Sequence, residues 1–146
     1  MSPSRISLPS AARAVYRAID ALDASAELEP RLRELVRIRA SQINGCAFCV
    51  DMHCVDAQAA GEADRRIFAL AAWRESPFFD GRERAALALT DAMTDLAADG
   101  VPDEVYEAAA AAFGDEELGN LMGVIIAINA WNRVAVATAV QPKELA

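Results

Sequence analysis

Three observations predict an all-α fold. Apolar residues recur with helical spacing along almost the whole chain, and no alternating apolar and polar run bounded by turn signals indicates a strand. Hydrophobic residues make up 54% of the 146 positions, and much of the excess is alanine, a good helix former with a small side chain. We therefore predict a compact bundle of about six to seven helices, with residues 1–146 forming a single domain.

Cap and breaker residues divide the chain into helices. Ser10 is the expected N-cap of the first helix, Asn44-Gly45 ends the second immediately before Cys46, and Asp80 caps the fifth. The helices are expected at about 10–23, 30–43, 46–60, 64–73, 80 to the stop at 99–102, 102–113 and 116–140.

The last of these helices is long and apolar enough to raise the question of a membrane span. Its asparagines, such as Asn132, and Arg133 would be costly in lipid, which favours a buried helix at a core or subunit interface. Gly119 and Gly123 suit close contact with another helix.

The charge balance limits the possible partners. A formal net charge of -8 provides no basic patch for phosphate backbones, so we expect no nucleic-acid partner. The polar residues of the last helix likewise lead us to expect no membrane partner. The first nine residues lack a basic region followed by an apolar run, and a cytoplasmic location is therefore expected. Cysteines in that compartment are mostly reduced, which favours redox chemistry or metal binding over structural disulfides.

Two cysteines and the only histidine gather in one short segment. At about 100° per residue, Cys46, Cys49 and His53 share one helix face, whereas Cys54 falls about 80° to the other side of Cys46. The positive end of the helix dipole favours a thiolate at Cys46, and His53 at i+4 is placed to take the proton of Cys49. This cluster predicts a thiol redox site.

Glu34 is the candidate carboxylate partner of His53. It lies on the preceding helix, which turns back at Asn44-Gly45, so its side chain is expected to reach the imidazole and orient it. Glu27 and Glu29 stay open as alternatives, and a glutamate on a helix is commonly a solvated surface charge.

A structural or metal-binding role uses the same residues. Free cysteines one turn apart are often small buried hydrophobes. Cys46, Cys49, His53 and either Cys54 or Glu34 also supply enough ligands for zinc, although three would come from one helix face. We expect no cofactor and no bound metal, and we keep the metal-binding helical module as an alternative.

These residues resemble the alkylhydroperoxidase D-like branch of the carboxymuconolactone decarboxylase family. The motif is a glutamate, eleven residues, and then Cys-x-x-Cys-x-x-x-His, which Glu34, Cys46, Cys49 and His53 match without a gap. The resemblance continues through 73–76, 83–87 and 128–133, and so covers about residues 28–142.

The resemblance implies a mechanism and partners. Cys49 would attack a hydroperoxide substrate with His53 and Glu34 relaying its proton, and Cys46 would resolve the sulfenic acid as a Cys46–Cys49 disulfide. A thioredoxin-like or lipoyl-type dithiol would then reduce that disulfide. The resemblance further implies a homo-oligomer, a trimer or hexamer.

One position departs from the family pattern. Phe48 stands between the cysteines, where the best-known members carry a second histidine. The namesake lyases act on a lactone without a cysteine pair, so Cys46 and Cys49 favour an oxidoreductase. A decarboxylase-like lyase that uses His53 and Glu34 as acid and base is kept as an alternative.

Overall fold

A computed structural model of the chain describes residues 4–145. Within this range it contains α-helices, one short 3₁₀ segment and no β-strand, and an isolated β-bridge joins Ala97 to Gly100. The elements are α1 (Leu8–Ala11), α2 (Arg13–Ser25), α3 (Pro30–Asn44), α4 (Ala47–Ala59), α5 (Asp64–Ala69), η1 (Leu70–Ala72), α6 (Gly81–Thr94), α7 (Asp103–Ala112) and α8 (Asp115–Thr138). The predicted all-α class is confirmed.

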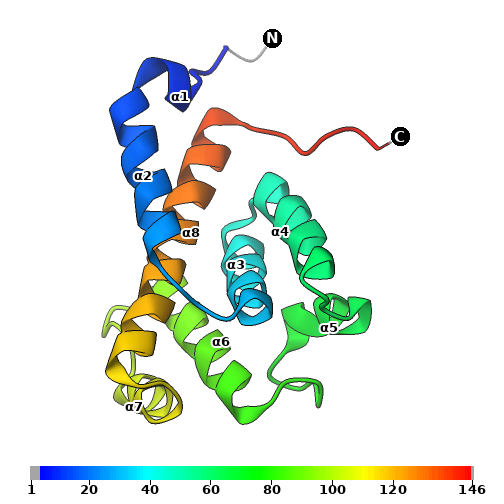
Figure 1. Cartoon of the computed structure of the whole chain (residues 1–146), viewed down its shortest axis with the longest axis vertical. Helices are drawn as coiled ribbons and strands as arrows, with labels where there is room; N and C mark the ends of the chain where they lie inside the picture. Colours follow the sequence, from blue (N-terminus) through cyan, green and yellow to red (C-terminus); the bar gives the residue numbers. More distant parts are fainter. Residues whose placement is uncertain (1–3, 146) are drawn as a thin grey trace.

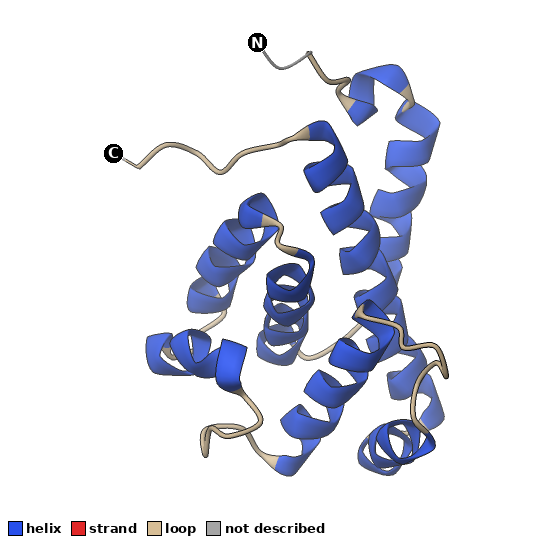
Figure 2. Cartoon of the chain, turned by 180° about the vertical axis from the view of Figure 1, so that it is seen from behind, coloured by secondary structure: helices blue, strands red, loops and turns tan. Residues whose placement is uncertain are grey.

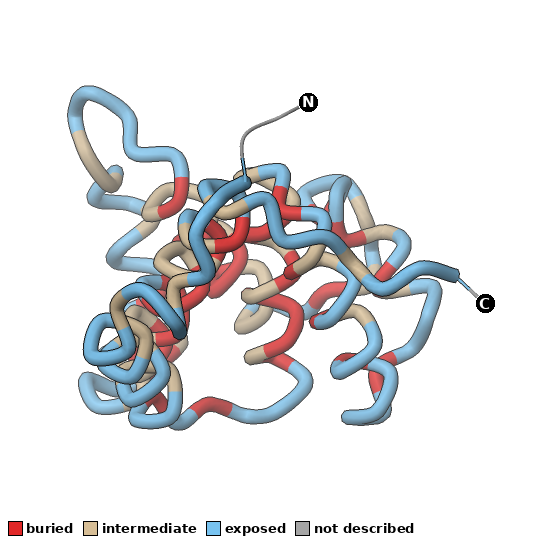
Figure 3. The backbone as a smooth tube through the Cα atoms, turned by 90° about the horizontal axis from the view of Figure 1, so that it is seen from above, coloured by how far each residue is buried: buried red, intermediate tan, exposed pale blue. Residues whose placement is uncertain are grey.

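Helix α3 occupies the centre of the bundle. It packs against α4, α6 and α8, while α2 runs along the outer side of α8 and α7 covers α6 (Figure 1). The view from behind shows that loops and turns join the helices throughout (Figure 2). Buried residues concentrate on the inward sides of the helices (Figure 3). Helix α2 has no buried residue.

Three groups of apolar side chains form the core. The largest joins α3, α6, α7 and α8, the second lies among α3, α4, α5 and α6, and the third surrounds the two cysteines. The second group includes Leu35, Ile38 and Trp73, and the third brings Cys46 and Cys49 against Ile128 of α8. The cysteine pair is thus part of the packed interior.

The N-terminal helix differs from the expectation. Instead of one helix from a Ser10 cap, there are two helices separated at Ala12, whose φ of -145° and ψ of 67° are not helical. Ser10 lies inside α1, because the first turn begins after Ser7, where Pro9 is tolerated without a backbone N–H. Because α1 and α2 replace one expected helix, the described range contains eight α-helices rather than six to seven.

Local cap chemistry was predicted correctly at two other sites. Gly45 ends α3 with φ 65°, in the left-handed region where glycine has no Cβ penalty. Asp80 caps α6 through a full capping box with Glu83. Helix α6 ends at Thr94, however, several residues before the expected stop, because 95–102 form a tight turn with Gly100 at φ 77°.

Helix α8 is long and apolar enough to cross a membrane by length and composition, and 39% of its most apolar stretch is buried inside the bundle. It packs against α2, α3 and α6, as expected for a helix of the core. A Cβ on Gly123 would lie 3.1 Å from that of Ala26, so Gly123 does allow close contact, whereas Gly119 faces open space.

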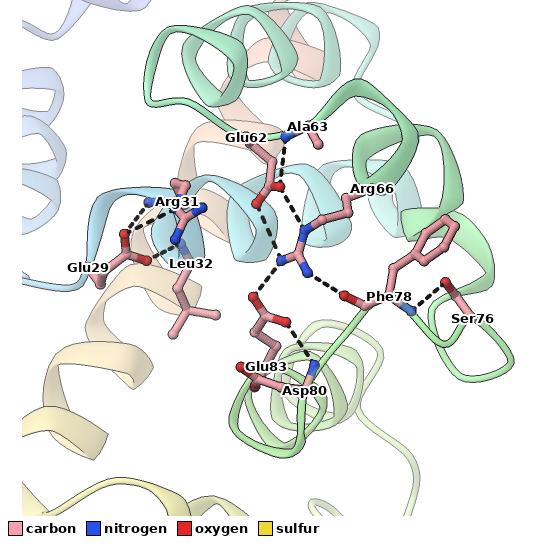
Figure 4. Close-up of polar contacts among 10 residues, drawn as sticks. All are labelled: Glu29, Arg31, Leu32, Glu62, Ala63, Arg66, Ser76, Phe78, Asp80 and Glu83. Carbon is pink, nitrogen blue, oxygen red and sulfur yellow. Dashed lines mark hydrogen bonds and ion pairs between the residues drawn. The ribbon is translucent and has the colours of Figure 1, made fainter.

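A charged clamp joins the α4–α5 connection to α6. Glu62 accepts a 2.7 Å bond from Arg66 Nε, and Arg66 also pairs with Glu83 and donates to the Phe78 carbonyl (Figure 4). Because Glu62 is buried and fully paired, the clamp fixes the loop after η1 without leaving an unpaired charge.

Candidate active site

Glu34 of α3 and His53 of α4 meet in the interior between these helices. The Gly45 turn folds α4 back onto α3, and Glu34 Oε2 lies 2.8 Å from His53 Nδ1. Both side chains are almost completely buried. When Nδ1 carries the proton that Glu34 accepts, Nε2 is left as a base. Of the three candidate carboxylates, Glu34 is thus the one in contact with the imidazole.

The other two glutamates lie elsewhere. Glu29 caps the start of α3 by accepting bonds from the Arg31 and Leu32 N–H groups. The backbone N–H of Glu27 donates to Asn120.

An ion-pair chain supports Glu34. Arg37 Nη1 lies 2.7 Å from Glu34 Oε1, and its Nη2 lies 2.7 Å from Asp23 Oδ1 on α2. Burial alone would raise the pKa of Glu34, but the bond to His53 and the charge of Arg37 outweigh it, so the pKa is lowered. The carboxylate therefore remains ionised and can hold the imidazole.

The two cysteines adopt a capping arrangement at the start of α4. Cys46 is the N-cap residue, and its sulfur accepts the backbone N–H of Cys49 at 3.4 Å. Both residues are buried, with 2% and 1% of their surface exposed, and both are free thiols. The Cys46 sulfur thus receives a backbone N–H bond at the positive end of the α4 dipole.

Cys49 is in a less favourable place for a charge. Burial, together with its interaction with Cys46, raises the pKa of Cys49 to about 12, and a hydrogen bond with Asn132 acts in the opposite direction. The reduced pair at rest therefore holds Cys49 as a thiol, and a base must remove its proton during any reaction.

Asn132 belongs to the site, although sequence reasoning treated it only as a polar residue of the last helix. Its side chain is fully buried; Nδ2 donates to Ser41 Oγ at 2.9 Å, and Oδ1 accepts from Asn44 Nδ2 at 2.9 Å. These bonds hold the amide in place beside Cys49, whose pKa it acts to lower. The signal that could have found it is an asparagine within a long apolar helix, where an unpaired amide is costly.

Cys49 and His53 line one cleft of about 300 Å³, which we call the Cys49 cleft. Its apolar walls come from α2, α4 and α8, where the rings of Tyr16 and Trp131 meet edge to face at 5.1 Å. The other lining residues are Asp20, Asp23, Phe48, Met52, Val134 and Ala135. A mostly apolar cleft with two carboxylates suits an uncharged or cationic organic molecule better than an anion.

Cys54 stands apart from this arrangement. It is half-buried and packs against the apolar group of Leu35 and Ile38, on another side of α4. Burial and the nearby Asp51 carboxylate raise its pKa.

The side chains that the metal-binding alternative would use do not come together around the thiols. Among residues 4–145, the side chains that could share a cation are Glu34, His53 and Asp56, with no cysteine among them. Glu34 is already paired with Arg37, whose positive charge disfavours a cation there. The geometry therefore fits a proton relay better than a metal centre.

Sequence comparison identifies the family. A model of the carboxymuconolactone decarboxylase family matches residues 9–92, more than half of the chain. The chain belongs to this family. The chain is also similar to two bacterial proteins, both uncharacterized. YdfG of Bacillus subtilis is 45% identical over 105 residues, 72% of this chain and 71% of YdfG. YnjA of Escherichia coli is 35% identical over 99 residues, 67% of this chain and 53% of YnjA.

Solved structures place this family member with alkylhydroperoxidase D-like folds. A protein of unknown function from Agrobacterium tumefaciens, described as a candidate AhpD antioxidant defence protein, superposes with a TM-score of 0.91. It is 40% identical, with 98% of this chain and 100% of that chain covered. The debrominase Bmp8 shares only the fold, at a TM-score of 0.71 and 21% identity, with 89% of this chain and 68% of that chain covered.

Proposed function

We propose that this protein is a thiol-dependent peroxidase that reduces organic hydroperoxides through Cys46 and Cys49. The observation that carries the proposal is the position of Cys49 in an apolar cleft beside His53, whose imidazole is bonded to the buried Glu34. Membership of the carboxymuconolactone decarboxylase family and the fold shared with the candidate AhpD antioxidant defence protein of Agrobacterium tumefaciens support it.

The first step forms a sulfenic acid. His53 Nε2 takes the proton of Cys49 directly or through a water, and the thiolate attacks the terminal oxygen of the hydroperoxide. The O–O bond breaks, the alkoxide leaves with the proton held by His53, and the oxygen remains on Cys49 as S–OH. Asn132 and Glu34 act on this step indirectly, the first by donating to sulfur and the second by stabilising the imidazolium.

The second step closes the disulfide. Cys46 Sγ attacks the sulfur of the sulfenic acid, hydroxide leaves and takes up the Cys46 proton as water, and the Cys46–Cys49 bond forms. The sum is one hydroperoxide and two thiols converted to an alcohol, water and a disulfide. A dithiol must then return both cysteines to thiols.

The high pKa of Cys49 explains why the site needs His53. At neutral pH a thiol with a pKa of about 12 is almost entirely protonated. A buried base that shares a hydrogen bond with a carboxylate gives the proton a nearby acceptor, and the carboxylate stabilises the imidazolium that forms.

Peroxide turnover with matched cysteine variants tests the proposal. With tert-butyl hydroperoxide as oxidant and dithiothreitol as reductant, Cys49→Ser is expected to abolish turnover, and Cys54→Ser is expected to retain it. Normal turnover in Cys49→Ser would overturn the proposal. A lactone-decarboxylating activity that survives replacement of Cys46 and Cys49 would favour the lyase instead.

We also propose that the protein acts in the cytoplasm as a trimer or hexamer. Half-exposed apolar residues on the outer faces of α2 and α8, such as Val15 and Ile126, are available for contacts between copies.

A further inference from the structure

Cys46 lines a second cleft, distinct from the Cys49 cleft. This Cys46 cleft has a volume of about 380 Å³ and lies between the start of α4, the end of α8, the segment before α1 and the segment after α8. Its lining includes Arg5, Gly45, Cys46, Val136 and Gln141. Ala135 is the one lining residue that the two clefts share, so it forms the wall between them.

The two clefts differ in charge. Asp20 and Asp23 line the Cys49 cleft, where Asp23 is paired with Arg37 and Asp20 adds a negative charge, whereas Arg5 is the charged residue in the lining of the Cys46 cleft. Arg5 Nη1 donates to the backbone carbonyls of Val136 at 3.3 Å and Ala137 at 2.9 Å, which fixes the segment before α1 across the end of α8. The dipole of α4 also places its positive end at Cys46. An anion is therefore favoured at the Cys46 cleft and disfavoured at the other.

We propose that the reducing dithiol binds in the Cys46 cleft and attacks Cys46 Sγ, while the oxidising substrate uses the Cys49 cleft. This inference rests on the proposed function, because it assumes that a Cys46–Cys49 disulfide is the oxidised form. The attacking species is a thiolate, so it gains from Arg5 and from the α4 N-terminus.

The thiol–disulfide exchange with the reductant takes place in two steps. The thiolate of the reductant bonds to Cys46 Sγ, the Cys46–Cys49 bond breaks, and the electron pair leaves on Cys49 Sγ, which takes a proton from His53. The charge of Cys46, one of the causes that raise the pKa of Cys49, is absent while Cys46 is in the mixed disulfide. The second thiol of the reductant then gives up its proton and attacks the reductant's sulfur in that mixed disulfide. The bond from that sulfur to Cys46 breaks, Cys46 takes up the proton as a thiol, and the reductant leaves as a disulfide.

The burial of Cys46 limits the size of the reductant. Only 2% of Cys46 is exposed, and the residue belongs to the lining of a cleft and does not stand on an open surface. A slender, linear dithiol can enter such a cleft, whereas a thiol set in the flat face of a folded protein cannot approach the sulfur in line. The preferred reductant is therefore a small dithiol or one carried on a flexible arm.

Small charged thiols test the route. In a Cys54→Ala background, the Cys46–Cys49 disulfide is formed with diamide, and its reduction rates by anionic 2-mercaptoethanesulfonate and cationic cysteamine are compared. Arg5→Glu is expected to lower the anionic-to-cationic rate ratio by about tenfold. Arg13→Glu, the same charge reversal at an exposed position outside both clefts, is expected to leave the ratio unchanged.

A blocking variant and an adduct map complete the test. Val136→Trp, at a half-exposed position, is expected to slow reduction by dithiothreitol about tenfold. Its oxidation by tert-butyl hydroperoxide should keep the original rate. After an acid quench, the monothiol adduct is expected on Cys46. The inference would be overturned by an adduct on Cys49, or by an anionic-to-cationic rate ratio that changes in Asp20→Lys and not in Arg5→Glu. A changed oligomer mass in Val136→Trp would also overturn it.

The two proposals fail in different ways. If hydroperoxide leaves the thiols unchanged while diamide forms the disulfide, the peroxidase proposal fails, and the reduction experiment still decides the route of the dithiol. If diamide also forms no Cys46–Cys49 disulfide, both proposals are overturned.

Discussion

His53 Nδ1 lies 2.8 Å from Glu34 Oε2, and the two side chains are buried together between α3 and α4. The contact fixes which ring nitrogen is free, because a proton on Nδ1 leaves Nε2 as the base. Removing the charge of Glu34 while keeping its shape therefore tests the relay directly.

Glu34→Gln is expected to lower turnover about 10- to 100-fold, in the range seen when a carboxylate partner of a functional histidine is lost. Arg37 keeps its bond to Asp23, so the fold should survive. Steady-state peroxidase kinetics provide the measurement, with Asp56→Asn as the matched control. Asp56 also faces His53 Nδ1, at 3.7 Å, but its side chain is 53% exposed, and its loss should matter far less. Equal effects of the two variants would contradict a specific role for Glu34.

Cys46→Ser is expected to lower the pKa of Cys49 from about 12, because it removes the Cys46 sulfur that opposes ionisation. The pKa should stay above the ordinary value of 9.0, since burial is the largest cause of the shift and is retained. In a Cys54→Ala background Cys49 is the only thiol left, so its thiolate absorbance near 240 nm can be followed against pH. A pKa that does not fall would show that burial alone sets the value.

Asn132→Ala is expected to raise the pKa of Cys49 and to slow its alkylation by iodoacetamide at pH 8 to 9. The variant also removes the two hydrogen bonds that the amide makes with Ser41 and Asn44, at a cost of about 1 to 3 kcal/mol in the free energy of unfolding. Asn129→Ala is a matched control, because it also removes an asparagine bonded to Asn44. A similar loss of stability with no change in thiol reactivity is expected there. If the two variants alter alkylation equally, Asn132 has no specific effect on Cys49.

Acid is expected to weaken the fold through Asp91. Burial raises the pKa of this carboxyl group, but its bonds to Arg39 and Arg74 outweigh that effect and lower the pKa below its ordinary value of 3.8. A carboxyl group whose pKa is lowered in the folded state stabilises the fold at pH values above its unfolded-state pKa. This stabilisation is lost as the pH falls below about 3.8 and through the folded-state pKa.

Urea unfolding at pH 7 and near pH 3 measures this contribution. Asp91→Asn should be less stable than the parent protein by about 1 to 3 kcal/mol at pH 7, and the difference should narrow in acid. The exposed Asp99→Asn is the control, with little difference at either pH. A gap between Asp91→Asn and the parent that is constant with pH would contradict the charge argument.

Helix type and most cap positions were predictable because they depend on local chemistry. Gly45 stops α3 by its left-handed backbone, and Asp80 starts α6 by a reciprocal hydrogen bond with Glu83, both of which the sequence indicates. The break at Ala12 was not predictable in this way, since an alanine favours a helix.

The site was predictable only where chain spacing determines proximity. One short segment carries Cys46, Cys49 and His53, and Glu34 matches the glutamate of the family motif. Asn132, by contrast, comes from a helix more than 75 residues further along the chain, and its bonds to Ser41 and Asn44 depend on how α8 packs against α3. The second cleft depends on Arg5 meeting the end of α8, a contact between the two ends of the chain that no local pattern indicates.

We propose that Cys46 and Cys49 form a redox pair that hydroperoxide oxidises. The most direct test of this proposal is the intact mass of the reduced protein after brief exposure to tert-butyl hydroperoxide, followed by denaturing alkylation and peptide mapping. We expect the loss of two hydrogen atoms, a disulfide between Cys46 and Cys49, and an alkylated Cys54. Three unchanged thiols would contradict the account.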